Sequence, residues 1–115
     1  MNGQALNKKL NAWAGTEGID YTDPEFGIAY CFKGLVPKLK EQGFLITLRL
    51  LGSIQGDWEA ELGKGFFPYK METAGYAETP ALALCRAIER LIEKRRGRID
   101  TDEHRQSHQN PDYPQ

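Results

Sequence analysis

The sequence predicts one α+β domain with elements in the order α-α-β-β-β-α, a three-stranded antiparallel sheet packed against helices. Three observations predict this fold class. Apolar residues recur at helical spacing before residue 43, alternate with polar ones between 44 and 77, and return to helical spacing after 80. Strands joined by short turns pair antiparallel, and 115 residues suffice for one domain with its own core.

Two helices are expected before the sheet. Residues 5–14 carry apolar side chains at helical spacing, and Gly15 ends this first helix. The second should run from about Pro24 to Gln42, because Asp23 can cap its free amides, and Pro37 should kink it. The apolar side of the second helix is expected to consist of Phe26, Ala29, Phe32, Leu35 with Val36, and Leu39.

Three strands are expected at 44–51, 57–62 and 67–77. The middle strand directs Trp58, Ala60 and Leu62 inward and Asp57, Glu59 and Glu61 outward. Helices over both sheet faces would bury these carboxylates, at a cost of several kcal/mol per unpaired charge. The acidic face is therefore expected to be at least half open. On the third strand, Tyr69, Met71 and Thr73 are expected to share one face.

The last helix is predicted from Pro80 to about residue 96. Thr79 and Pro80 form its start signal, and Gly97 supplies its end. Its apolar stripe, expected to cover the inner sheet face, consists of Ala81, Leu84, Cys85, Ile88, Leu91 and Ile92. We accordingly expect one sandwich domain over residues 1–97 and a disordered, flexible polar tail over 98–115.

The composition is that of an ordinary soluble protein, with 40% hydrophobic residues, 27% charged residues and a formal net charge of −1. This balance gives no global field directed at nucleic acid or at an acidic substrate. The N-terminal segment lacks the apolar core of a signal peptide, and no apolar run approaches the roughly 18 residues of a membrane span. We expect a cytoplasmic protein with Cys31 and Cys85 as buried, reduced thiols.

Four segments carry a family likeness: DYTDPEFGIAY, LVPKL leading into GFLITLRL, GDWEAEL, and above all AETPALALCRAIERLIE. Together they make the chain resemble the phage ABA sandwich domain family of small prophage proteins, over roughly Leu6 to Glu93. The resemblance implies an α/β sandwich and a phage or prophage origin. It implies no activity, because no function is established for the family.

A weaker likeness is to HicB-type antitoxins, in which a strand pair leads through GYAETP into an Ala/Leu-rich helix. The matching candidate site for nucleic acid consists of Arg86, Arg90, Lys94, Arg95 and Arg96. Basic residues also offset the dipole at a helix C-terminus, so both interpretations stay open. The element order also resembles double-stranded RNA-binding domains, but the start of this helix, AETPALALC, carries no base.

Other motifs favour structural explanations. His104 and His108 have a metal-ligand spacing but lie in a polar segment with no apolar stripe to hold a helix. Around Asp20, the stretch DYTDPE lacks the ligand pattern of a calcium loop, and helix capping explains Asp23 and Glu25. No Ser/His/acid or Cys/His set stands out. We therefore expect no enzyme, no metal site and no cofactor.

Phe66, Phe67 and Tyr69 gather around the second turn and the third strand, and are the best indication of a contact surface. The favoured hypothesis is a small phage-encoded, non-catalytic protein that binds an unknown host or phage protein. An antiparallel sheet with an exposed edge strand can also pair with a second copy, which would give a homodimer. The alternative is an antitoxin-like or other nucleic-acid-associated protein that uses the basic end of the last helix.

Overall fold

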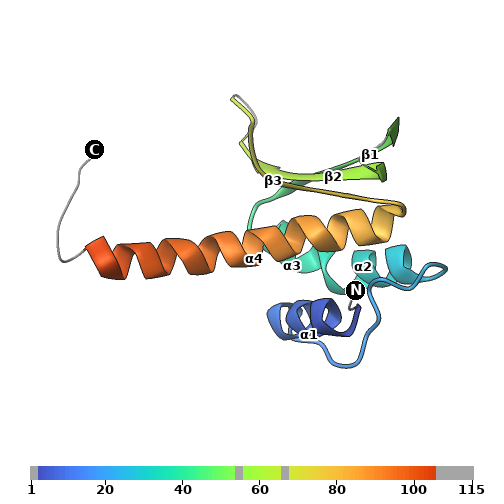
Figure 1. Ribbon diagram of the computed structural model, residues 1–115, viewed down its shortest axis with the longest axis horizontal. Helices are drawn as coiled ribbons and strands as arrows, with labels where there is room; N and C mark the ends of the chain where they lie inside the picture. The colour runs from blue at the N-terminus through green and yellow to red at the C-terminus, as the bar shows by residue number, and fades with distance from the viewer. Residues whose placement is uncertain (1–2, 54–55, 66–67, 106–115) are drawn as a thin grey trace.

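The computed structural model describes residues 3–53, 56–65 and 68–105, and it confirms the predicted fold class. The elements are α1 (Gly3–Ala14), α2 (Gly27–Gly34), α3 (Val36–Glu41), β1 (Leu45–Ser53), β2 (Gly56–Lys64), β3 (Lys70–Ala77) and α4 (Pro80–Arg105). Figure 1 shows three layers, with the sheet above α4 and the other helices below it. The long helix α4 is therefore the middle layer of the molecule.

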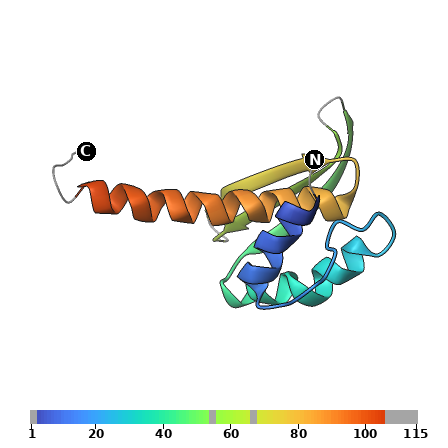
Figure 2. The ribbon, with the colours of Figure 1, turned by 60° about the horizontal axis from the view of Figure 1, so that its bottom comes forward.

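The sheet is antiparallel in the order β1-β2-β3, and Ala60 at its centre pairs with Leu48 on one side and Gly75 on the other. In both views, the helices of the described chain lie on one side of this sheet (Figures 1 and 2). The acidic face was expected to be at least half open; no described helix covers it, although Glu59 on that face is only 8% exposed. Because β2 alternates strictly, Ala60 and Leu62 are fully buried on the helical side.

Helix α4 is buried on two sides because layers lie above and below it. On the sheet side, Ala83 and Ala87 approach β3 so closely that a Cβ added to Gly75 would clash with the helix backbone. On the other side, the Cys85 sulfur lies 3.9 Å from that of Cys31 in α2. The predicted stripe is thus incomplete, because the sheet is met by small alanines as well as by larger apolar residues. Both cysteines are buried and free, as predicted.

The second predicted helix is broken into α2 and α3 around Leu35. Pro37 has no N–H to continue the hydrogen-bond ladder, and the break falls just before it. Regular helix begins at Gly27 rather than at Pro24, because residues 24–26 form a turn. Asp23 nevertheless caps this turn as predicted, with its Oδ1 accepting from the amides of residues 25 and 26 at 2.7 and 2.8 Å.

The buried side of α2 and α3 differs from the predicted one. Phe26 and Phe32 are 51% and 54% exposed, and Ala29 is exposed as well. The buried positions follow i, i+4 spacing and are Gly27, Cys31, Leu35 and Leu39. Glycine decides the choice, because a Cβ at position 27 would lie 2.6 Å from the carbonyl oxygen of Tyr21. The prediction that Phe26 and Phe32 lie on the buried side is therefore wrong.

The prediction that Gly97 ends the last helix is wrong, since α4 continues to Arg105. One interior glycine costs only about 1 kcal/mol relative to alanine, which the strong helix formers on its N-terminal side offset. The C-terminal part of α4 extends beyond the sheet (Figures 1 and 2). The remainder of the predicted tail, residues 106–115, lies outside the described residues.

A register shift in β3 separates residues that were expected to share a face. Leu62 of β2 pairs with Thr73, but the next residue, Gly63, pairs with Met71. The Thr73 hydroxyl donates to the Ala87 carbonyl in α4 at 2.9 Å, so Thr73 points toward the helices. The Tyr69 hydroxyl instead lies against Gly63 and close to the Glu61 charge on the opposite face.

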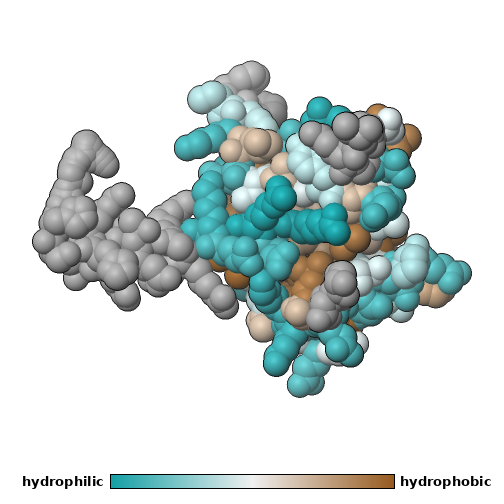
Figure 3. Space-filling model, viewed as in Figure 1, coloured by the Kyte–Doolittle hydropathy of each residue, from teal (hydrophilic) through white to brown (hydrophobic). Residues whose placement is uncertain are grey.

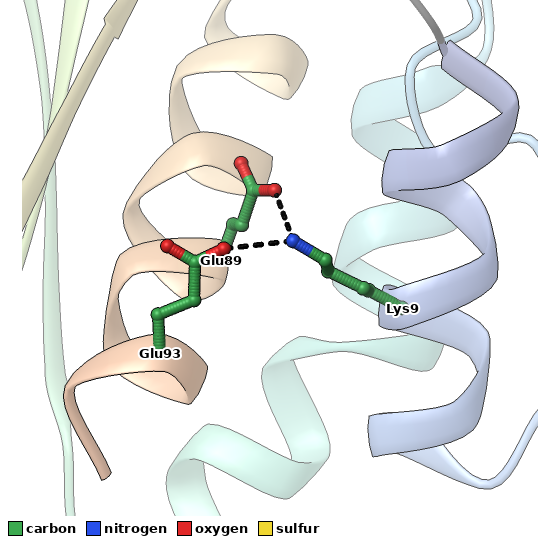
Figure 4. A network of polar contacts seen from close by, with 3 residues as sticks. All are labelled: Lys9, Glu89 and Glu93. Carbon is green, nitrogen blue, oxygen red and sulfur yellow. Dashed lines mark hydrogen bonds and ion pairs between the residues drawn. The ribbon is translucent and has the colours of Figure 1, made fainter. Parts of the chain in front are cut away.

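Helix α1 is fastened to α4 by ion pairs. The ammonium group of Lys9 lies 2.8 Å from a carboxylate oxygen of Glu89 and 2.7 Å from one of Glu93 (Figure 4). The hydrogen bond to Glu89, followed by that to Glu93, raises the pKa of Lys9 above its usual value. Below these groups, the buried side chains of Leu6 and Leu10 complete the contact with the core.

Candidate functional site

The open face of the sheet carries a polar network contributed by all three strands. Arg49 of β1 lies directly opposite Glu59 of β2, with its Nε 3.3 Å from Oε1. Its guanidinium also reaches Oε2 of Glu61 at 3.4 Å. From β3, the Tyr76 hydroxyl donates to Oε2 of Glu59 at 3.1 Å. We call Arg49, Glu59, Glu61 and Tyr76 the open-face network.

Although no described helix covers this face, Glu59 is only 8% exposed, because neighbouring side chains of the same face enclose it. Its hydrogen bond with Tyr76, together with burial, raises the pKa of that tyrosine. Burial and then the charge of Glu61 likewise raise the pKa of Tyr69. Arg49 pairs with both carboxylates and Tyr76 donates a further hydrogen bond to Glu59, so these side chains hold one another in place on the open face.

The outer edge of β3 is capped by basic side chains of α4. Arg86 donates to the carbonyl of Tyr76 at 2.7 Å, and Arg90 to that of Ala74 at 2.8 Å. Lys94 donates to the carbonyl and carboxylate oxygens of Glu72 at 3.2 and 3.1 Å. We call Arg86, Arg90 and Lys94 the edge ladder. Figure 3 shows hydrophilic side chains gathered where α4 runs beside the sheet.

The regular spacing of the edge ladder follows from the two backbone repeats. Four helical residues rise about 6 Å, and two strand residues advance about 6.6 Å. Basic residues at i, i+4 and i+8 on α4 therefore match alternate carbonyls along β3. The three residues of the edge ladder were predicted to bind nucleic acid, but they donate hydrogen bonds to carbonyls of the edge strand β3. Without them, these carbonyls would be unpaired acceptors open to other chains.

The opposite edge of the sheet, formed by β1, lacks this protection. In an antiparallel sheet, the backbone N–H and C=O groups of successive residues point alternately to the two sides of each strand. The carbonyls of Tyr76 and Ala74 point away from β2. The pairing of the three strands then requires that the backbone groups of Ile46, Leu48 and Leu50 also point away from β2, on the opposite edge. No hydrogen bond joins these outward groups to another part of the described chain. Leu50 is also 66% exposed, and Leu45 is exposed at the other end of the strand. We call this row of backbone groups the β1 edge.

Arg95 belongs to a different cluster, at the end of the sheet where β2 finishes and β3 begins. Its guanidinium accompanies the Lys64 ammonium over the Phe44 ring, at 5.5 and 4.7 Å from the ring centroid. It also donates to the side-chain oxygen of Gln42 at 3.0 Å. Arg95, Lys64, Phe44 and Lys70 are among the residues that line a pocket of about 410 Å³.

The remaining predicted site residues fall in different places. Tyr69 borders the open-face network, whereas Phe66 and Phe67 lie outside the described residues, as does the side chain of Arg96. Arg49 and Lys70 were not among the residues predicted to form a site. Arg49 could have been found from its position on the polar side of β1, but Lys70 is brought to α4 only by the turn between β2 and β3.

In the acidic stretch before α2, Asp23 has the capping role that was predicted, whereas Asp20 has a role in the loop that was not. Asp20 accepts from the Thr22 hydroxyl and from Asn7, both at 2.7 Å, and these hydrogen bonds, with that of Thr22 first, lower its pKa. A hollow of about 640 Å³ lies beside this loop, with Tyr30 and Lys33 of α2 in its wall. Its polar side chains are held mainly by the local loop structure.

Within residues 3–53, 56–65 and 68–105, no group of three or more His, Cys, Asp or Glu side chains is placed to hold a metal ion. None of the helices in those ranges combines the length and apolar character needed to cross a membrane. His108 lies outside them, and the side chain of His104 is not described.

In comparisons with known proteins, no family model matches the chain, and neither a curated protein nor a solved structure gives a match. The resemblance to the phage ABA sandwich family therefore stays a prediction. Within the described residues, the architecture is an α+β sandwich in which helices cover one face of the sheet, basic side chains of α4 cap the β3 edge, and no such cap is found on the β1 edge.

Proposed function

We propose that the protein is a small non-catalytic interaction module that binds an extended segment of a partner protein along the β1 edge. The segment would add a fourth strand to the sheet, with main-chain hydrogen bonds to Ile46, Leu48 and Leu50. Following the family resemblance, the partner would be a host or phage protein in the cytoplasm of an infected cell.

The observation that carries this proposal is the different treatment of the two sheet edges. The edge ladder occupies the outward carbonyls of β3 with three cationic side chains. The β1 edge has no such ladder among the described residues, and exposed leucines flank it. Monomeric proteins commonly protect both edge strands of a sheet against pairing with other chains. An edge that no described residue covers, beside a face of mutually bonded polar side chains, suits strand addition.

The sharpest test replaces Leu50 by proline. The N–H of Leu50 points outward, so Leu50→Pro removes a donor that a partner strand needs while keeping the hydrogen bonds between β1 and β2. Leu50→Val keeps that donor and serves as the matched control. Each tagged protein, checked for folding by circular dichroism, would be used to recover partners from nuclease-treated lysate of phage-infected bacteria.

The expected result is one polypeptide recovered by the wild-type protein and by Leu50→Val, but not by Leu50→Pro. Equal recovery by all three proteins would reject the β1 edge as the binding site. Recovery of nothing but nuclease-sensitive material would reject the interaction module itself.

The second possible partner of the β1 edge is another copy of this chain. Light scattering would then show a dimer that Leu50→Pro converts to a monomer.

The nucleic-acid alternative stays a prediction with a narrower basis. Arg86, Arg90 and Lys94 would have to leave carbonyl acceptors on β3 before they could contact phosphates. Breaking such charge-assisted hydrogen bonds costs about 1.5–3 kcal/mol each where the groups are buried, and less at this exposed surface. The geometry therefore favours protein binding at the β1 edge over nucleic-acid binding by the edge ladder.

A further inference from the structure

The pocket at the end of the sheet is lined by an unusual set of charges. Buried Phe44 and Leu91 form its apolar floor, and it has a volume of about 410 Å³, within the usual range for small-ligand sites. The charged residues of its lining are Lys64, Lys70, Glu72, Lys94 and Arg95. These side chains come from β2, β3 and α4, so the tertiary fold assembles the pocket.

The charges around this pocket do not balance. Four cations and one carboxylate give a local charge of +3, in a chain whose formal net charge is −1. Lys64 also pairs directly with Lys70 in the register of β2 and β3, an arrangement that repels. In the described parts of the chain, no carboxylate lies within ion-pair distance of either lysine. Among the side chains that the structure describes, the fold therefore brings more positive than negative charge to this pocket.

We propose that this pocket binds a small anion with two or three phosphate groups, held by Lys64, Lys70 and Arg95. Several converging cations suit such a ligand, because charge-assisted hydrogen bonds to phosphate are among the strongest in proteins. Lys94 already bonds to Glu72 and orients that wall of the pocket. This inference is independent of the proposed strand addition, which uses backbone groups of β1 rather than the side chains that line this pocket.

The recognised chemistry is the phosphate chain rather than an attached base. Phe44 is only 7% exposed, and the cations of Lys64 and Arg95 already lie over its ring. A nucleobase would have to displace them before it could stack there. Inorganic tripolyphosphate is therefore a suitable probe, because it presents the phosphates alone.

The test is isothermal titration of tripolyphosphate into the full-length protein. The pocket variant is Lys64→Gln with Lys70→Gln, and the matched control is Lys8→Gln with Lys40→Gln, two exposed lysines on α1 and α3. We expect 1:1 saturable binding by the wild type and the control, and a loss of about tenfold or more in the pocket variant.

Three results would overturn the proposal. The first is an absence of saturable binding by the wild-type protein. The second is an equal loss of affinity in the pocket variant and the control, which would reveal general charge attraction. The third comes from a single-stranded oligonucleotide measured at about 50 and about 200 mM salt. If it binds more tightly than tripolyphosphate and displaces it, the pocket is a nucleic-acid contact and the small-ligand assignment is wrong.

Discussion

Replacing Gly75 by alanine tests how closely α4 lies against the sheet. A Cβ at this position would be 2.5 Å from the amide nitrogen of Ala87 and closer still to the carbonyl oxygen of Ala83. Both neighbours are helix backbone, which cannot turn aside as a side chain can. To restore an ordinary contact of 3.4 Å, α4 must move away from β3 by about 1 Å.

The cost of that movement can be worked out from the contacts that it disturbs. Overpacking of a close contact costs about 1–3 kcal/mol. The same shift takes the Thr73 hydroxyl out of range of the Ala87 carbonyl, and this buried hydrogen bond contributes about 1 kcal/mol. We therefore expect Gly75→Ala to lower the free energy of unfolding by roughly 2–4 kcal/mol. For a domain of this size, the melting temperature should fall by about 10 °C or more.

Urea denaturation followed by circular dichroism, with a thermal melt, provides the measurement. The control is Gly43→Ala, where φ is +83° but nothing lies within 4 Å of the added Cβ. That substitution carries backbone strain alone and should cost about 1 kcal/mol. If Gly75→Ala proves no more destabilising than Gly43→Ala, then α4 does not approach β3 as described, and the spacing argument for the edge ladder fails with it.

Three further predictions follow from individual contacts. The raised pKa of Tyr76 means that its contribution to stability is complete below the unfolded value of 10.0 and is lost as the pH rises through the higher folded value. Tyr76→Phe, which loses the bond to Glu59, should cost about 1 kcal/mol at neutral pH and flatten this alkaline fall in the urea midpoint. The lowered pKa of Asp20 works in the opposite direction: its contribution is present above 3.8 and is lost as the pH falls through the lower folded value. Asp20→Asn should therefore destabilise the protein at pH 7 but much less at about pH 2.5, as measured by urea titration. The hydrogen bond with Cys31, followed by burial, raises the pKa of Cys85. Because both cysteines are buried, a thiol reagent at about pH 8 should label neither of them until guanidinium unfolds the chain. Rapid labelling of the native protein would contradict their burial.

The sequence predicted the three strands and the faces of β2 because those signals are local, but it missed the register shift that places Tyr69 and Thr73 on opposite faces. Alternation along β2 assigned Ala60 and Leu62 to the core correctly, and the carboxylates on the other side predicted an uncovered face. The buried side of α2 was not predictable in the same way. The large apolar rings of Phe26 and Phe32 predicted that their side of the helix is buried. The close approach of Gly27 to the Tyr21 carbonyl instead places the side of Gly27 and Cys31 against the core. That approach depends on a tertiary contact, which periodicity does not contain.

The candidate sites show the same division between local and tertiary information. The basic spacing of Arg86 and Arg90 was visible in the sequence, but the acceptors on β3 were not, so a nucleic-acid role stayed open. Lys64 and Lys70 lie on either side of a turn, and nothing local indicates that they meet the end of α4. A local charge count could identify the edge-ladder residues as basic, but only the sheet register could relate them to carbonyls or to a pocket.

The position of α4 limits where this protein can contact others. One side of the helix carries Ala83 and Ala87, which pack closely against Gly75. A second side packs against Cys31 of α2, and a third carries the edge ladder. Changes on any of these sides alter the core or expose the edge of β3, so most of the helix within the domain is occupied by structural demands. The β1 edge carries no comparable commitment, because its outward groups satisfy nothing else in the described chain. A partner that binds there can add to the sheet without disturbing the helix that holds the domain together.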